Sequence, residues 1–174
     1  MSGYVNRGTK PYDAVFKGIL DSKIDLVTSV PCINLKELIH MVETSNDIIH
    51  VPVSREEEGV GICAGAYMGF KRTAILMQNS GLGNSINALA SLNLLYGIPL
   101  LMIVSHRGTD EETISAQIPM GDLTPKLLDT IGIPYFITDS VIEVHDIIVD
   151  AWEKAELMRK PVAVLLPISF WRSI

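Results

Sequence analysis

Apolar and polar positions along the chain predict helices that separate short buried strands. Apolar residues spaced three or four positions apart predict helices over residues 11–20, 35–42, 54–70, 83–95, 123–131 and 141–158. Short apolar runs rich in β-branched residues predict strands over residues 25–30, 48–53, 73–77, 99–105, 135–138 and 162–166. This order predicts a three-layer α/β fold, in which roughly six parallel strands carry helices on both faces. Several strands are apolar throughout, as expected when both faces of a sheet are covered.

Composition narrows the classes of protein to consider. The 174 residues are 48% hydrophobic and 20% charged, which predicts one globular domain over residues 1–174. The net charge of -6 argues against partners such as nucleic acid or an anionic membrane surface. The apolar runs are too short to span a bilayer, and the first residues lack the apolar core of a secretory signal. Two cysteines outside any CxxC pair suit reduced thiols, so we expect a cytoplasmic protein.

Four loops are expected at the ligand-binding edge of this sheet, because ligands gather where parallel strands end. They cover residues 31–34, 54–58, 78–84 and 105–121. In the first loop, Pro31 ends a strand and Asn34 can cap the next helix. In the last, His106 and Arg107 follow a buried strand and could meet an anionic substrate, or could belong to a solvated loop.

The segment SREEEGVGICAGAYMGF, residues 54–70, combines three glutamates with a helix expected to be buried. Ser54 and Glu57 match a capping box, while Glu56 and Glu58 suit the positive end of the helix dipole. A carboxylate at the start of a buried helix has limited access to water, which suits proton exchange with a bound ligand. The alternative is that all three glutamates only stabilise the start of the helix.

The segment MQNSGLGNSINALASL, residues 77–92, is expected to form a glycine-rich turn between a strand and a helix. Gly81 and Gly83 permit close backbone approach, and a helix N-terminus offers free N–H groups. The segment matches neither GxGxxG nor the GK[ST] of a P-loop. It could bind an anion, a polar ring or a neighbouring chain, or it could be an ordinary tight turn.

These motifs together resemble the pyrimidine-binding domain of the thiamine-diphosphate-dependent decarboxylases. The resemblance covers nearly the whole chain and is most specific in QNSGLGNSINALASL, GIPLLMIVSHRG, Gln117, VPCINLK and EEEGVGICAGAY. It implies that Glu56, found by counting back from Gly61 and Gly65, hydrogen-bonds N1′ of the cofactor's aminopyrimidine ring. The residues that it implies near the cofactor are Pro31, Gln78, Ser80, Gly81, Gly83 and Asn84.

The resemblance also implies that this chain holds half of an active site. Full-length family members bind the diphosphate through a divalent metal held by a GDG motif, and the sequence contains no GDG. We therefore expect no metal ligands here and a hetero-oligomer with a beta subunit that holds Mg²⁺ and the diphosphate. Cys32 stands where single-chain relatives often have an aspartate.

Within the family, the resemblance is strongest to decarboxylases of sulfopyruvate and phosphonopyruvate, which are small anionic 2-oxo acids. The expected reaction converts 3-sulfopyruvate to sulfoacetaldehyde and carbon dioxide, a step in coenzyme M biosynthesis. Arg107 is the first candidate for the substrate's tetrahedral anion and Lys36 the second, while His106 and Gln117 are candidates for its other polar groups. The alternatives are half of a split decarboxylase for phosphonopyruvate or another 2-oxo acid, and a non-catalytic structural subunit.

Overall fold

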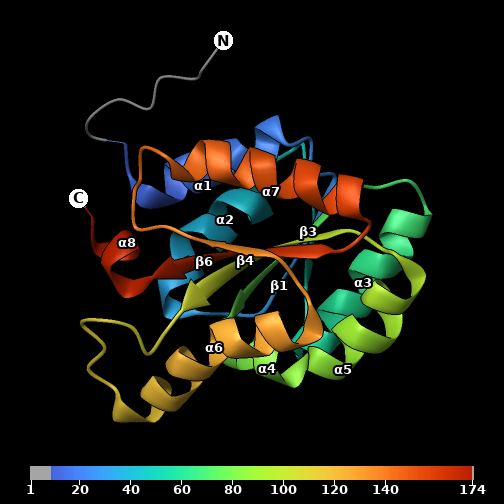
Figure 1. Cartoon of the computed structure of the whole chain (residues 1–174). Helices are drawn as coiled ribbons and strands as arrows, with labels where there is room; N and C mark the ends of the chain where they lie inside the picture. The colour runs from blue at the N-terminus through green and yellow to red at the C-terminus, as the bar shows by residue number, and fades with distance from the viewer. Residues whose placement is uncertain (1–8, 174) are drawn as a thin grey trace.

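A computed structural model describes residues 9–173, and in this range the chain forms one sheet of six parallel strands (Figure 1). The strands lie in the order β2-β1-β3-β4-β6-β5, and every neighbouring pair is parallel. Their bounds are β1 Leu26–Ser29, β2 Ile49–Pro52, β3 Thr73–Gln78, β4 Leu100–His106, β5 Tyr135–Ile137 and β6 Pro161–Pro167.

Helices cover both faces of the sheet, which confirms the predicted three-layer α/β fold (Figure 1). One face carries α1 Pro11–Asp21, η1 Ile33–Leu35, α2 Lys36–Thr44, α7 Val144–Met158 and α8 Ile168–Arg172. The other face carries α3 Glu56–Met68, α4 Asn79–Asn84, α5 Ile86–Ala88, the π-helical turn η2 Leu89–Leu94, and α6 Ile118–Ile131 with the short η3 Ser115–Gln117 before it.

The core forms two layers because residues on each strand alternate between the two faces. Along β4, Leu101 and Ile103 pack under α1, α2 and α7, whereas Met102 and Val104 pack under α3 and α6. The four inner strands are almost entirely buried, while the edge strands β2 and β5 are partly exposed. This burial explains why the inner strands are apolar throughout and show no alternation in the sequence.

The sequence predicted that helix α3 is buried, but one of its faces is exposed. Val60 and Cys63 pack against the sheet, but Gly61, Ile62 and Gly65 lie on an exposed face. Burial raises the pKa of the Cys63 thiol to about 11, so this cysteine remains neutral and is sealed from solvent. The small α8 was not predicted.

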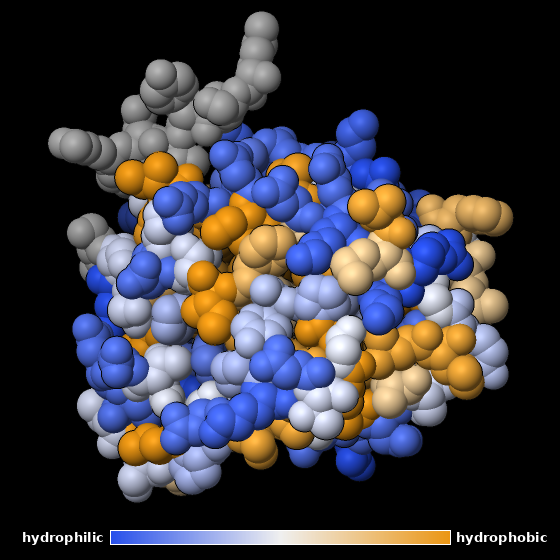
Figure 2. Space-filling view, viewed as in Figure 1, coloured by the Kyte–Doolittle hydropathy of each residue, from blue (hydrophilic) through white to orange (hydrophobic). Residues whose placement is uncertain are grey.

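Large apolar side chains are exposed on the same side of the molecule. Figure 2 shows apolar surface over the side where α3 and α5 lie. Phe70, which follows α3, is 97% exposed and has a positive φ of 65°. Other large apolar side chains that are mostly exposed include Met68, Leu95, Tyr96 and Leu157. In the described part of the chain, no helix is both long enough and apolar enough to cross a membrane.

A buried histidine joins α1 to α7. The two imidazole nitrogens of His145 lie 2.7 Å from Asp21 Oδ2 and 2.7 Å from Asp146 Oδ1. Burial lowers the pKa of His145, but the hydrogen bonds and charges of the two aspartates outweigh burial and raise the pKa above its ordinary value of 6.5. No spacing in the sequence had indicated this pairing, because Asp21 is 124 residues away.

Protonation of His145 is therefore expected to stabilise the fold. A raised folded-state pKa adds stability that is complete below about pH 6.5 and is lost as the pH rises through the folded-state pKa. His145→Gln should accordingly lower the melting temperature most at about pH 6 and least at about pH 9. Exposed His40 supplies the control, since His40→Gln should change the melting temperature little at either pH. An equal loss for His145→Gln at both pH values would show that its charge does not contribute.

Candidate active site

The sheet has a topological switch point between β1 and β3, where ligands of open α/β sheets characteristically bind. These two strands are neighbours, but the helix after β1 covers one face and the helix after β3 covers the other. The chain therefore parts at their carboxyl ends, where a ligand crevice is expected, and we call this edge the crevice. Pro31 and Cys32 follow β1 at this crevice, and Gln78 ends β3.

Glu56 is the first residue of α3 and lies against the backbone of α4. A Cβ atom added at Gly81 would overlap the carboxyl group of Glu56, so only glycine leaves room for this side chain. Glu56 is half-buried at the carboxyl edge of the sheet. This contact places one carboxylate beside the glycine-rich segment that the sequence had singled out.

The other two glutamates lie in different surroundings. Glu57 forms an ion pair with Arg55, with Oε1 2.6 Å from Nη2, and Glu58 is exposed. The predicted capping box is wrong, because α3 begins at Glu56 and Arg55 occupies the N-cap position without a side-chain cap. The helix therefore starts two residues later than expected, and its three acidic residues complement the positive end of its dipole.

Polar side chains from three separate segments meet across the crevice. Gln78 Nε2 donates hydrogen bonds to Ser80 Oγ at 2.9 Å and to Gln117 Oε1 at 3.1 Å. Cys32 Sγ lies 3.9 Å from Gln78 Oε1. Asn34 does not cap α2 as expected but donates to Ser105 Oγ at 3.1 Å. The sequence-predicted residues Gln78, Ser80 and Gln117 are thus brought together.

The glycine-rich segment is a helix, not the predicted loop. β3 ends at Gln78 and α4 starts at Asn79 with no connection between them. The segment therefore does not form a phosphate-cradling turn. A Cβ at Gly83 would meet the flexible end of Met120 at 3.0 Å, and Asn84 is exposed at the end of the helix.

The loop after β4 is also shorter than predicted, because 3-10 helix η3 begins at Ser115 and α6 at Ile118. Gly108, with φ of 77°, holds the loop close to the start of α6, since a Cβ there would overlap the carbonyl oxygen of Gln117. Buried Asn79 ties the loop to α4. Its amide oxygen accepts from Arg107 N at 3.0 Å, and its amide nitrogen donates to Arg107 O at 3.1 Å.

Arg107 is bound by a glutamate that the sequence had not singled out. Its Nε and Nη2 donate to Glu112 at 2.7 Å and 2.8 Å, and the two side chains are 11% and 2% exposed. Its partner is thus Glu112, and neither of the two acidic residues before it, Asp110 and Glu111. The hydrogen bond from Arg107 lowers the pKa of Glu112 to about 2, so the pair remains ionised near neutral pH.

His106 and Lys36 are not hydrogen-bonded to Gln78 or Gln117 in the described part of the chain, although Lys36 lines a pocket with Pro31 and Cys32. His106 is buried on the α6 side of the sheet, where its Nε2 lies 3.0 Å from the carbonyl oxygen of Gly121. Burial lowers the pKa of His106, so the ring is neutral near pH 7. Lys36 is exposed at the start of α2 and forms a 3.9 Å ion pair with Glu37. Pro31 is exposed beside Cys32.

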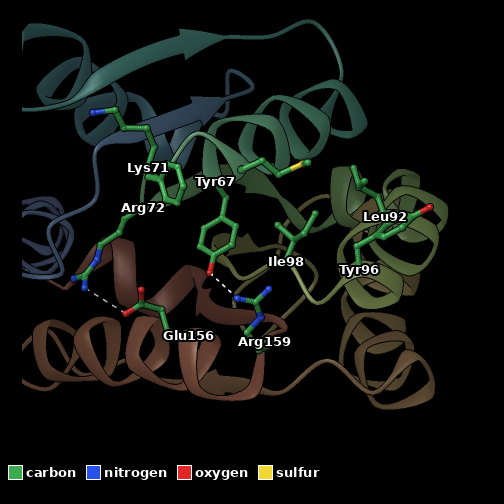
Figure 3. A pocket seen from close by; sticks show the side chains of 10 residues that line it. Tyr67, Lys71, Arg72, Leu92, Tyr96, Ile98, Glu156 and Arg159 are labelled. Atoms are coloured by element: carbon green, nitrogen blue, oxygen red, sulfur yellow. Dashed lines mark hydrogen bonds and ion pairs between the residues drawn. The ribbon is translucent and has the colours of Figure 1, made fainter.

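A cavity of about 810 Å³ lies at the opposite edge of the sheet (Figure 3). Tyr67 and Phe70 precede β3, Tyr96 precedes β4, and Arg159 precedes β6, so this cavity opens at the amino ends of the strands. Arg159 Nη1 donates to the Tyr67 hydroxyl at 3.2 Å. The cavity is therefore separate from the crevice, which holds the candidate residues at the carboxyl ends.

The crevice fits a polar heterocycle better than a metal ion. Among residues 9–173, no group of three or more histidine, cysteine, aspartate or glutamate side chains is arranged to hold a metal. The Glu56 carboxyl group instead lies against Gly81, three residues after Gln78, whose side-chain amide bonds that of Gln117, so this edge can offer a carboxyl group and amide hydrogen bonds to a flat ring. This donor set fits the aminopyrimidine end of thiamine diphosphate.

Comparison with known proteins agrees with this geometry. Residues 10–130 match the family described as thiamine pyrophosphate enzyme, N-terminal TPP binding domain. The sulfopyruvate decarboxylase subunit alpha of Methanococcus maripaludis is 56% identical over 91% of this chain and 95% of that protein. The phosphonopyruvate decarboxylase of Streptomyces viridochromogenes is 32% identical over 86% of this chain but 38% of that protein.

A solved structure supports the fold independently. The 2-oxoglutarate:ferredoxin oxidoreductase from Magnetococcus marinus matches with a TM-score of 0.77 at 20% identity. The match covers 93% of this chain and 29% of that one, which shows the same fold within a larger protein. Together with the family match and the similarity over nearly the full length of a relative, these findings show that the chain belongs to the sulfopyruvate decarboxylase alpha-subunit family of thiamine pyrophosphate enzymes.

Proposed function

We propose that this chain, assembled with a beta subunit, decarboxylates 3-sulfopyruvate to sulfoacetaldehyde and carbon dioxide with thiamine diphosphate as cofactor. The observation that carries the proposal is the Glu56 carboxyl group seated on Gly81 at the switch-point edge of the sheet. Relatives named sulfopyruvate decarboxylase subunit alpha support the substrate and the subunit arrangement, because they match this chain over nearly their whole length. We place the enzyme in the cytoplasm.

In this proposal, Glu56 holds a proton at N1′ of the bound aminopyrimidine ring. Gly81 fixes the direction of the carboxyl group, because the side chain of Glu56 fills the space that a Cβ atom at this position would take. Gln78 and Ser80 line the same crevice and can orient the ring through hydrogen bonds. Bound thiamine diphosphate supplies the electron sink that makes loss of carbon dioxide possible.

The substrate end of the crevice is assigned to Cys32, Gln117 and Arg107. Gln117 reaches the crevice through its hydrogen bond to Gln78. Arg107 is the cation at this end, and three of its five N–H groups are not used by Glu112. Those N–H groups can bind a tetrahedral anion such as a sulfonate. His106 and Lys36 are secondary candidates, because His106 is bonded to Gly121, whereas Lys36, which shares a pocket with Cys32, is paired with Glu37.

The beta subunit is assigned the diphosphate and its Mg²⁺. Magnesium is held by oxygen ligands, commonly carboxylates together with phosphate oxygens. In the described part of the chain, the three acidic residues at the start of α3 do not form such a group with the crevice cluster. A hetero-oligomer in which two subunits share one cofactor accounts for these assignments.

The purified chain alone should therefore release no carbon dioxide from sulfopyruvate, with or without thiamine diphosphate and Mg²⁺. The chain co-expressed with its beta subunit should release it, and sulfopyruvate should be preferred to phosphonopyruvate and pyruvate. The measurement is carbon dioxide release from each acid by equal amounts of the two preparations.

Each contrary outcome has a distinct meaning. Turnover by the chain alone would contradict the shared site. Preference for phosphonopyruvate would show that the substrate is the alternative acid, which carries a phosphonate in place of the sulfonate. Cofactor binding by the assembled protein without turnover of any 2-oxo acid would favour a structural subunit.

A further inference from the structure

We propose that Glu112 is a positioning residue, which holds the Arg107 guanidinium so that its free edge meets the anionic end of the substrate. This inference rests on the proposed function, because it assigns a task to Arg107 at the substrate end of the crevice. It adds a residue that does not itself touch the substrate.

The contacts of Glu112 are complete and directed. Its Oε2 accepts from Arg107 Nε at 2.7 Å and from Gly108 N at 3.1 Å. Its Oε1 accepts from Arg107 Nη2 at 2.8 Å and from Ile114 N at 3.0 Å. Four donors therefore fix the carboxylate, and the two parallel bonds to Arg107 fix the plane of the guanidinium.

Arg107 is fixed at its backbone as well. The side-chain amide of Asn79 bonds both the N–H and the carbonyl of Arg107, at 3.0 Å and 3.1 Å. Long side chains such as arginine ordinarily keep much rotamer freedom at a loop. Here both ends of the side chain are held, which prepares the guanidinium before any substrate arrives.

The location of the Arg107–Glu112 ion pair indicates that Glu112 orients Arg107 and does not mainly stabilise the fold. Removing two charges from water is costly, and buried ion pairs are often no more stabilising than apolar residues of similar volume. Neighbouring Glu111 forms an exposed 3.2 Å ion pair with Arg172, which requires less desolvation of the two charges. The Arg107–Glu112 pair instead lies at the carboxyl end of β4, beside the strand that carries Gln78.

The free edge of Arg107 consists of the N–H donors that Glu112 does not bind. Arginine has five N–H donors, and Glu112 binds the Nε donor and one Nη2 donor. Both Nη1 donors and the second Nη2 donor remain, and these form the edge that suits two oxygens of one anion. The hydrogen bond to Glu112 raises the pKa of Arg107, and Cys32, which lies near the guanidinium, adds a smaller contribution in the same direction.

The test uses the chain assembled with its beta subunit. Glu112→Gln keeps the size of the side chain but cannot form the charge-assisted pair. We expect KM for sulfopyruvate to rise roughly tenfold while kcat stays within about twofold, as expected for loss of substrate binding. Glu111→Gln is the matched control, because Glu111 is exposed and pairs with Arg172, and its KM should not change.

A double-mutant cycle separates positioning from a structural role. If Glu112 acts through Arg107, Arg107→Ala and Arg107→Ala with Glu112→Gln should show the same KM. Independent effects of the two changes, or a fall in kcat and melting temperature without a change in KM, would overturn the inference. A complex that turns over no 2-oxo acid before any substitution would instead refute the proposed function.

A second variant covers the case in which Glu112→Gln does not assemble. Glu112→Asp keeps the charge but is one methylene shorter, so it cannot bind Arg107 with the same two bonds. A smaller rise in KM with unchanged kcat is expected for this variant. An assembled Glu112→Asp complex with an unaltered KM for sulfopyruvate would contradict the inference.

Discussion

Glu56→Gln should lower kcat of the assembled enzyme by about a hundredfold or more, because it removes the group that we propose holds a proton at the cofactor ring. The fold should be retained, since Glu56 has the same size as glutamine and starts a helix whose packing lies further along at Val60 and Cys63. The measurement is kcat at saturating cofactor and substrate, together with the melting temperature and the size of the complex.

Two neighbouring glutamates provide the controls for this prediction. Glu57 is paired with Arg55, and Glu58 is exposed, so neither lies over Gly81 as Glu56 does. Glu57→Gln and Glu58→Gln should each retain most of kcat, with small losses of stability from the weaker helix-dipole interaction. A loss of about a hundredfold in either of these variants, with an active Glu56→Gln enzyme, would move the catalytic assignment to that residue.

Gly81→Ala should lower kcat nearly as far as Glu56→Gln does. The added Cβ would overlap the Glu56 carboxyl group, so the side chain must move away from its position at the crevice. Alanine is otherwise favoured over glycine in a helix by about 1 kcal/mol, so the variant need not be less stable elsewhere. Loss of activity with a retained melting temperature would identify displacement of Glu56 as the cause.

Gly83→Ala is the matched control within the same helix. Its new Cβ would meet the terminal methyl of Met120 at 3.0 Å, and methionine can shift at little cost. Because Glu56 stays in place, this variant should keep kcat at saturating cofactor, even though the family resemblance puts Gly83 near the cofactor as well. If both alanine variants are fully active, the contact between Glu56 and Gly81 does not govern the reaction.

Most of the fold could be predicted because the inner strands are continuous apolar runs and the long helices have strong periodic patterns. The predicted capping box at Ser54 was wrong because the turn after β2 delays the start of α3 to Glu56. The local motif alone does not determine where the helix begins. The helix α4 was missed because its glycines have low intrinsic helix propensity. Tertiary contacts outweigh that propensity, including the close approach of Glu56 to Gly81.

The candidate site could be predicted where several of its residues lie at the end of one strand. It could not be predicted where a side chain bonds to a residue that is distant in the sequence. Gln78 and Gln117 are 39 residues apart but bond directly, and the family resemblance had indicated both. Glu112 is one of three consecutive acidic residues, and no spacing distinguishes it from its neighbours. Asn79 was overlooked because its task is to hold the backbone of a distant loop.

The direct passage of β3 into α4 has a consequence for how the chain can vary in length. One residue inserted between Gln78 and Gly81 would turn the rest of α4 by about 100° and advance it by about 1.5 Å. Gly81 would then face away from Glu56, so insertions and deletions should be excluded from this junction. The exposed connection between β5 and α7, which includes Asp139 and Ile142, faces no such restriction and can accept a change of length.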